Sequence, residues 1–118
     1  MDVTLKKYIE FKMPEFKKLV FPVFTTVIDK MSMSYTITPI ESGVISKYDA
    51  EIKIFGSNYD EVRASKKKLI KILENTDQKE AISFNNNYFT ANLSGGGILF
   101  RDDLQMWEDS SIFIIKGK

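Results

Sequence analysis

The spacing of apolar side chains changes along this chain, and those changes restrict what it can fold into. Over residues 31–38 apolar and polar side chains alternate, and the alternation resumes over 45–55. A period of two is typical of strands with one face in water. Pro39 and a turn signal at residues 41–43 separate the two segments. We therefore expect two strands that pair in an antiparallel hairpin.

Two other segments have helical spacing. Residues 2–13 carry apolar side chains three and four apart until Pro14, which ends or kinks a helix. The second helix is predicted at 58–75, where Asn58 followed by Glu61 resembles a capping box. Its lysines lie in the second half, as the helix dipole favours.

The C-terminal part has the composition of strands and turns. We expect a turn at 85–87, a strand up to the glycines at 95–97, and a further strand over 98–106 that is interrupted by a bulge or a tight turn at Asp102-Asp103. The glycines lack the Gly-Lys-Ser/Thr ending of a phosphate loop, so they indicate a hairpin or a bulge. Glu108-Asp109-Ser110 is predicted as a turn, and 111–116 as a strand buried on both faces.

Near the N-terminus, residues 18–26 are rich in Phe and Val and contain Pro22, which predicts an extended edge element. The order of helix, strands, helix and strands predicts the α+β class, as a mainly antiparallel sheet with two helices packed on one face.

Composition restricts function more than it indicates one. The chain has 118 residues, a net charge of +1, and neither Cys nor His. These absences exclude thiolate zinc sites, cysteine nucleophiles and a Ser-His-Asp triad. We expect a single domain over 1–118 that is not an enzyme and needs no cofactor or metal. Uninterrupted apolar runs reach about four residues, so we expect a protein made in a cytoplasm, without a membrane partner.

Acidic side chains near the C-terminus offer one alternative. Asp102, Asp103, Glu108 and Asp109 could together bind Mg²⁺, which would favour a metal-dependent enzyme. Solvated turn residues are the simpler interpretation, because Asp is common in turns for local hydrogen-bonding reasons.

The second predicted helix is strongly basic and offers another alternative. Its cations are Arg63, Lys66, Lys67, Lys68 and Lys71. Five positive charges could contact nucleic-acid phosphates, which would make the chain a small nucleic-acid-binding α+β module that uses the basic helix 63–71. No aromatic side chains lie between them for base stacking, and a solvated or subunit-contact face is the simpler interpretation.

The same residues support a comparison with a known family. The chain combines an N-terminal helix ending at Pro14 with Tyr48-Asp49-Ala50-Glu51-Ile52-Lys53-Ile54-Phe55, a helix from Tyr59-Asp60-Glu61 to Leu73, and the ending Phe100-Arg101-Asp102-Asp103-Leu104-Gln105-Met106-Trp107-Glu108 before Ile112-Phe113-Ile114-Ile115. Over residues 2–116 this pattern resembles the tail-completion or tail-terminator proteins of long-tailed bacteriophages. The minor structural proteins of phages from Gram-positive bacteria resemble it most.

The resemblance implies a non-catalytic structural role in the virion. Subunits of this family form a ring, usually a hexamer, that caps the tail tube, ends its polymerisation and joins the tail to the head. The implied partners are other copies of the chain, the tail tube protein and a head-side connector or head-completion protein. The implied location is the head–tail junction, after assembly in the host cytoplasm. DNA passing through the lumen would make only non-specific contacts.

A ring requires two different lateral patches that meet head to tail. The candidate subunit-interface residues are Val20, Phe21, Val23, Phe24 and Trp107. Trp107 fits core burial and an interface equally well. The candidate lumen-facing or partner-facing residues are the five cations from Arg63 to Lys71.

Overall fold

The fold is α+β, as the order of elements predicted. The computed structural model describes residues 2–25, 27, 29–41, 46–74, 82–84 and 86–117. Within them lie two α-helices, α1 (Asp2–Lys12) and α2 (Tyr59–Leu73), and the short 3-10 helix η1 (Pro14–Phe16). The strands are β1 (Val20–Pro22), β2 (Ser32–Glu41), β3 (Ser46–Gly56), β4 (Ile82–Phe84), β5 (Asn87–Arg101) and β6 (Met106–Gly117). The expectations at Thr26, Ser42-Gly43, Ile45, Asn75 and Asn85 lie outside the described residues.

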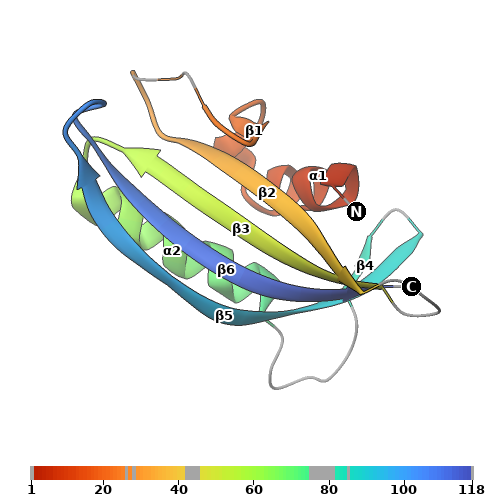
Figure 1. The fold of residues 1–118 in the computed structure, drawn as a ribbon. Helices are drawn as coiled ribbons and strands as arrows, with labels where there is room; N and C mark the ends of the chain where they lie inside the picture. The colour runs from red at the N-terminus through yellow and green to blue at the C-terminus, as the bar shows by residue number, and fades with distance from the viewer. Residues whose placement is uncertain are drawn as a thin grey trace.

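One mixed sheet of six strands contains all the strands, in the order β1-β2-β3-β6-β5-β4 (Figure 1). The expected antiparallel pair is confirmed as β2 and β3, with Tyr35 opposite Ile52. However, β1 runs parallel to β2, with Val20 opposite Met33. The expectation of a mainly antiparallel sheet was therefore wrong. The reason is that the chain returns to the level of Val20 before β2 begins, so the two strands share a direction.

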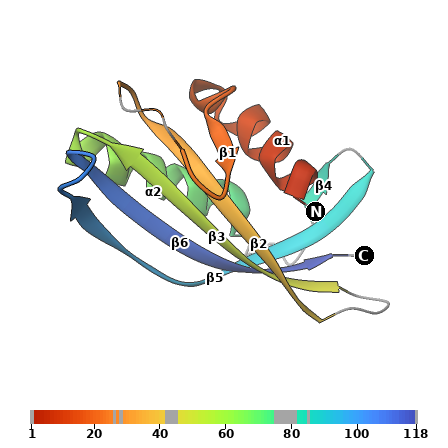
Figure 2. The same ribbon diagram turned by 45° about the horizontal axis from the view of Figure 1, so that its top comes forward.

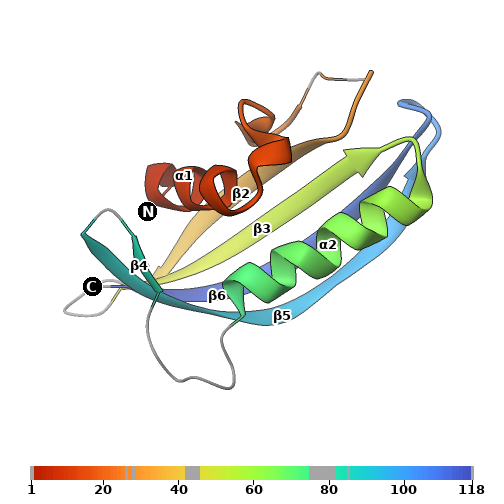
Figure 3. The same cartoon turned by 180° about the vertical axis from the view of Figure 1, so that it is seen from behind.

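The helices do not form a simple pair on one face of a flat sheet, because the sheet curls. Helix α2 lies along β3, β6 and β5 (Figure 3). Helix α1 packs instead between the two ends of the sheet (Figure 2). It contacts β1 on one side, and its Tyr8 ring lies 5.5 Å from Phe84 in β4 and 5.7 Å from Phe89 in β5. The Tyr8 hydroxyl also donates to the Ile72 carbonyl of α2 (2.8 Å).

The core fills the space between the curled sheet and the helices. Alternate strand residues point into it, as the period of two predicted. The strands contribute Met33, Tyr35, Ala50, Ile52, Ile54, Phe89, Ala91, Phe113 and Ile115. The helices contribute Leu5, Ile9, Val62, Leu69 and Leu73, and Met13, between α1 and η1, is buried with them. We expected the opposite face of β2 to be exposed to solvent, but Ser32 and Ser34 on that face are buried. One reason is the loop after β1, where the Thr25 and Ser32 hydroxyls lie 2.9 Å apart.

The second predicted helix is confirmed with its cap. Asn58 precedes α2 in an extended conformation, and its side-chain oxygen accepts a hydrogen bond from the Glu61 amide (3.1 Å). Such a bond satisfies one of the first-turn amides that have no partner inside the helix. Val62, Leu69 and Leu73 face the core, as their spacing predicted.

The C-terminal strands are longer than the sequence indicated. The glycines at 95–97 lie within β5, with a register shift between Leu93 and Gly95, so the bulge interpretation is confirmed. The turn falls at 102–105, and β6 then runs through Glu108-Asp109-Ser110, where a turn was wrongly predicted. Ile112 and Ile114 are only half-buried, so β6 is not buried on both faces. The acidic residues Glu108 and Asp109 are accommodated in this strand because basic side chains form ion pairs with them.

Candidate interaction surfaces

The candidate interface residues near β1 differ in exposure. Val20 belongs to the core, with 1% of its surface exposed, so it offers no contact surface. Phe21 is half-buried. Val23 and Phe24 are 66% and 67% exposed. Of these four candidates, Val23 and Phe24 provide the exposed apolar surface that we expected. Both follow β1, which is an edge strand as predicted. We call Val23 and Phe24 the protruding pair.

A tight backbone arrangement holds the protruding pair outward. Pro22 ends β1, and Val23 adopts a left-handed conformation with φ +68°. Its amide donates to the Tyr35 carbonyl, and the Phe24 amide donates to the Pro22 carbonyl, both at 2.8 Å. A left-handed β-branched residue costs on the order of 1–3 kcal/mol and persists only where the surroundings impose it.

Trp107, the remaining interface candidate, belongs to an aromatic cluster on the helix side of the sheet. Its ring packs edge-on against Tyr59 of α2 (5.0 Å between centroids) and Phe100 of β5 (5.1 Å). Trp107 itself is half-buried at the margin of the core. The cluster ties the start of α2 to the end of the β5–β6 hairpin.

The basic helix does not present five free cations. Arg63 Nη1 donates to Asp109 Oδ2 (3.2 Å), and Lys66 Nζ donates to Asp109 Oδ1 (2.8 Å). The Asp109 side chain is completely buried, whereas Arg63 and Lys66 are 39% and 13% exposed. Both cations therefore form ion pairs that link α2 to β6. Sequence reasoning missed this role because the partners are more than 40 residues apart.

A second ion pair removes another cation from the basic face. Lys68 Nζ donates to Glu15 Oε1 of η1 (2.9 Å). Burial raises the pKa of Glu15, but hydrogen bonding to Lys68 and to its own backbone outweighs it, and the pKa is lowered. Within the described ranges, Lys67 and Lys71 have no such partner, and both are exposed. Among contacts between described residues, these two of the five candidate cations form no ion pair.

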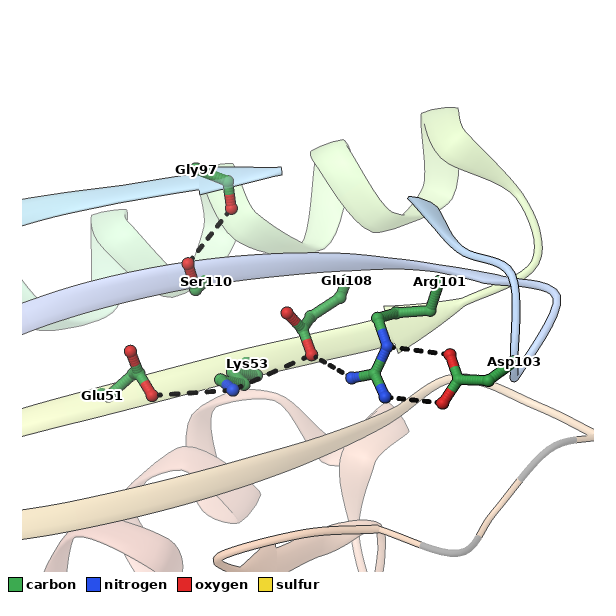
Figure 4. A network of polar contacts seen from close by, with 7 residues as sticks. All are labelled: Glu51, Lys53, Gly97, Arg101, Asp103, Glu108 and Ser110. Atoms are coloured by element: carbon green, nitrogen blue, oxygen red, sulfur yellow. Dashed lines mark hydrogen bonds and ion pairs between the residues drawn. The ribbon is translucent and has the colours of Figure 1, made fainter. Parts of the chain in front are cut away.

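The acidic residues of the C-terminal hairpin fall on opposite faces of the sheet. Arg101 donates to Asp103 through Nε and Nη2 (2.9 and 2.7 Å) and to Glu108 through Nη1 (3.0 Å), on the face away from α2 (Figure 4). Lys53 lies 3.8 Å from Glu108 on that same face. Asp109, one residue later in β6, points to α2 instead.

Hydrogen bonds from Arg101 lower the pKa of Asp103, and the pKa of Arg101 is raised in return. Asp102 and Asp103 are exposed turn residues, as predicted, but Glu108 and Asp109 are buried rather than solvated. The part of the chain that the structure describes has no group of three or more acidic side chains placed to hold a metal ion. The four acidic candidates therefore do not converge.

Neither α1 nor α2 is long and apolar enough to cross a membrane. A scan of the chain against protein-family models gives no match, and a search of the curated proteins gives none either.

Proposed function

We propose that this protein is a non-catalytic structural subunit of a long-tailed phage. It forms a ring, most simply a hexamer, that caps the tail tube, ends tail polymerisation and joins the tail to the head-side connector. The resemblance of the sequence to tail-terminator proteins suggests this role. The structural observation that supports it is apolar surface at two opposite edges of the sheet.

These edges carry different residues. At the β1–β2 edge, Val23, Phe24 and Ile40 are exposed. On β5, Leu93 and Phe100 are exposed on the face that α2 covers, and Leu99 is exposed on the opposite face. The sheet order places β1 and β2 at one end and β5 towards the other. A head-to-tail contact joins two different patches of the same molecule, and such contacts generate rings when the rotation closes. Exposed apolar patches on small domains mark interaction sites.

The alternative, a nucleic-acid-binding module that uses the basic helix, has less support. Arg63 and Lys66 neutralise Asp109, and Lys68 pairs with Glu15. Lys67 and Lys71 remain for contact with phosphates or with DNA in a ring lumen. Two cations give a weak electrostatic contribution, since affinity for DNA depends on the number of phosphates neutralised.

Light scattering of the purified protein across a concentration series tests the proposal, with electron microscopy of the same samples. We expect a single closed assembly with a mass near six subunits and ring-shaped particles. High salt should leave the assembly intact, because its contacts are apolar. A strict monomer at every concentration would overturn the proposal. DNA binding that weakens steeply with salt, without assembly, would favour the alternative.

A further inference from the structure

Helix α1 carries a large apolar side chain that the core does not bury. Phe11 is 67% exposed, although its ring packs against Phe84 of β4, with 5.7 Å between the ring centroids. Helix α1 lies at the surface of the molecule (Figure 2). A single exposed aromatic is ordinary on a protein surface, so the surroundings of Phe11 decide what it means.

Those surroundings form a hollow of about 390 Å³ beside the ring. It is lined by residues of α1, of η1 and of the two positions after η1, namely Lys7, Glu10, Phe11, Pro14, Lys17 and Lys18. We call these six residues the lysine hollow. Phe11 and Pro14 provide its apolar surface, and charged side chains surround them. A few charged groups around an apolar surface are typical of a binding site.

The charges of the lysine hollow are not balanced. Its three lysines are exposed, and among contacts between described residues none of them forms an ion pair. Among the described lining residues Glu10 is the one acid, so the lining has an excess of two positive charges. The whole chain has a net charge of only +1. Positive charge is therefore concentrated around Phe11.

The backbone that carries the last lysine is strained. Lys18 has a left-handed conformation with φ +65°, which is unfavourable for a residue with a side chain. Glu10 stabilises it, because Glu10 Oε2 accepts a hydrogen bond from the Lys18 amide (2.6 Å). Glycine would adopt this backbone without strain, yet the position holds a third cation. Strain of this kind is concentrated at functional sites.

We infer that the lysine hollow binds an acidic segment of a protein partner, with carboxylates against its three lysines and an apolar side chain against Phe11. Charge complementarity selects this partner, because an excess of positive charge attracts carboxylates and repels a basic segment. Nucleic acid fits less well, since its affinity depends on many neutralised phosphates and the hollow has three cations. The inference goes beyond the proposed ring, whose contacts between copies are apolar, and does not depend on it.

A labelled peptide is the probe. Fluorescence anisotropy measures the binding of fluorescein-labelled Asp-Glu-Asp-Phe-Asp-Glu, and the same peptide with Lys in place of every acid is its control. We expect the acidic peptide to bind, more weakly as salt rises, and the basic peptide not to bind. Phe11→Ala should weaken binding roughly tenfold, as for an aromatic at the centre of an interface. Tyr88→Ala is the matched control, because Tyr88 is 57% exposed and lies outside the hollow.

Two charge variants should act in opposite directions. Lys17→Met removes a cation and should weaken binding roughly threefold, whereas Glu10→Gln removes the acid and should strengthen binding roughly threefold. The glutamine oxygen can still accept the hydrogen bond from the Lys18 amide, so the turn is preserved. Lys67→Met, at an exposed position of α2, is the matched control for charge and should bind like the wild type.

The possible failures are distinct. The inference is overturned if the acidic peptide does not bind, if the basic peptide binds equally well, or if Glu10→Gln weakens binding. Tighter binding of a single-stranded deoxythymidine dodecamer would overturn it in favour of nucleic acid. If Lys17→Met prevented assembly of the protein, a second copy would occupy the hollow and the inference would also be wrong. A monomeric wild type that binds the acidic peptide overturns the ring alone. If Phe11→Ala fails to fold, Phe11→Leu replaces it.

Discussion

At the scale of single residues, the most consequential group is the buried carboxylate of Asp109. A carboxylate in the middle of a sheet is costly unless it is paired and hydrogen-bonded. Here each carboxylate oxygen of Asp109 accepts a hydrogen bond, one from Arg63 and one from Lys66, and Lys66 also donates to the Ser110 carbonyl (3.2 Å). These two ion pairs with Asp109 therefore fix the position of α2 along β6, in addition to the apolar contacts between the two elements.

Lys66→Met should lower the free energy of unfolding by about 2–3 kcal/mol, because it leaves a buried charge with one partner. Arg63→Met should cost less, since Arg63 is more exposed and its bond is longer. Urea unfolding measures both, with Lys67→Met as the control on the exposed face. If Lys66→Met and Lys67→Met lowered the free energy of unfolding equally, the ion pair between Lys66 and Asp109 would not be what holds α2 on β6.

At the scale of elements, the long β5–β6 hairpin depends on its bulge. The register shifts between Leu93 and Gly95, which accommodates one extra residue in β5. Gly96 then takes a conformation that side chains rarely adopt. The backbone conformation at Gly96 therefore requires glycine, whereas the conformations at Gly95 and Gly97 do not.

Gly96→Ala should destabilise the fold by about 2–4 kcal/mol, through the clash with Ser110 and the unfavourable backbone. Gly95→Ala should instead raise stability by about 0.5 kcal/mol, since it restricts the unfolded chain without strain. Thermal unfolding of the two variants side by side provides the measurement. If both substitutions had the same sign, the distinction between the glycines would fail.

At the scale of the whole molecule, the curled sheet and α1 depend on each other. Tyr8 contacts β4, β5 and α2, and η1 continues α1 towards β1. Burial raises the pKa of Tyr8, consistent with its place between these elements. Because α1 joins both ends of the sheet, we expect one cooperative unit, as predicted for a single domain over 1–118.

Ile9→Ala removes a fully buried side chain of α1 and should cost about 2–4 kcal/mol. Far-ultraviolet circular dichroism and Trp107 fluorescence should shift together, because single domains of this size usually unfold in one cooperative transition. Val3→Ala, at a position 62% exposed, is the control and should change little. An early helical transition that precedes the fluorescence change would show that α1 unfolds separately.

Part of the fold could be predicted because its signals are local. The cap at Asn58 and the apolar spacing of α2 lie within one helix, and the alternation in β2 and β3 lies within each strand. The parallel pairing of β1 could not be predicted, since it depends on where the chain returns after Pro22. The strand through Glu108 and Asp109 was missed for the same reason, because the cations Arg63 and Lys66 that neutralise Asp109 lie on another element.

By itself, the sequence determined the α+β class, the capped basic helix and the lack of imidazole and thiol chemistry, because composition and periodicity are properties of short segments. Only the tertiary structure decided which cations are free, which apolar residues are exposed and which glycines have room beside them. Those depend on distant residues brought together by the curled sheet. The tertiary structure exposes Val23 and Phe24 but buries Val20, and it places Gly96 at a bulge where an added Cβ would meet the Ser110 carbonyl.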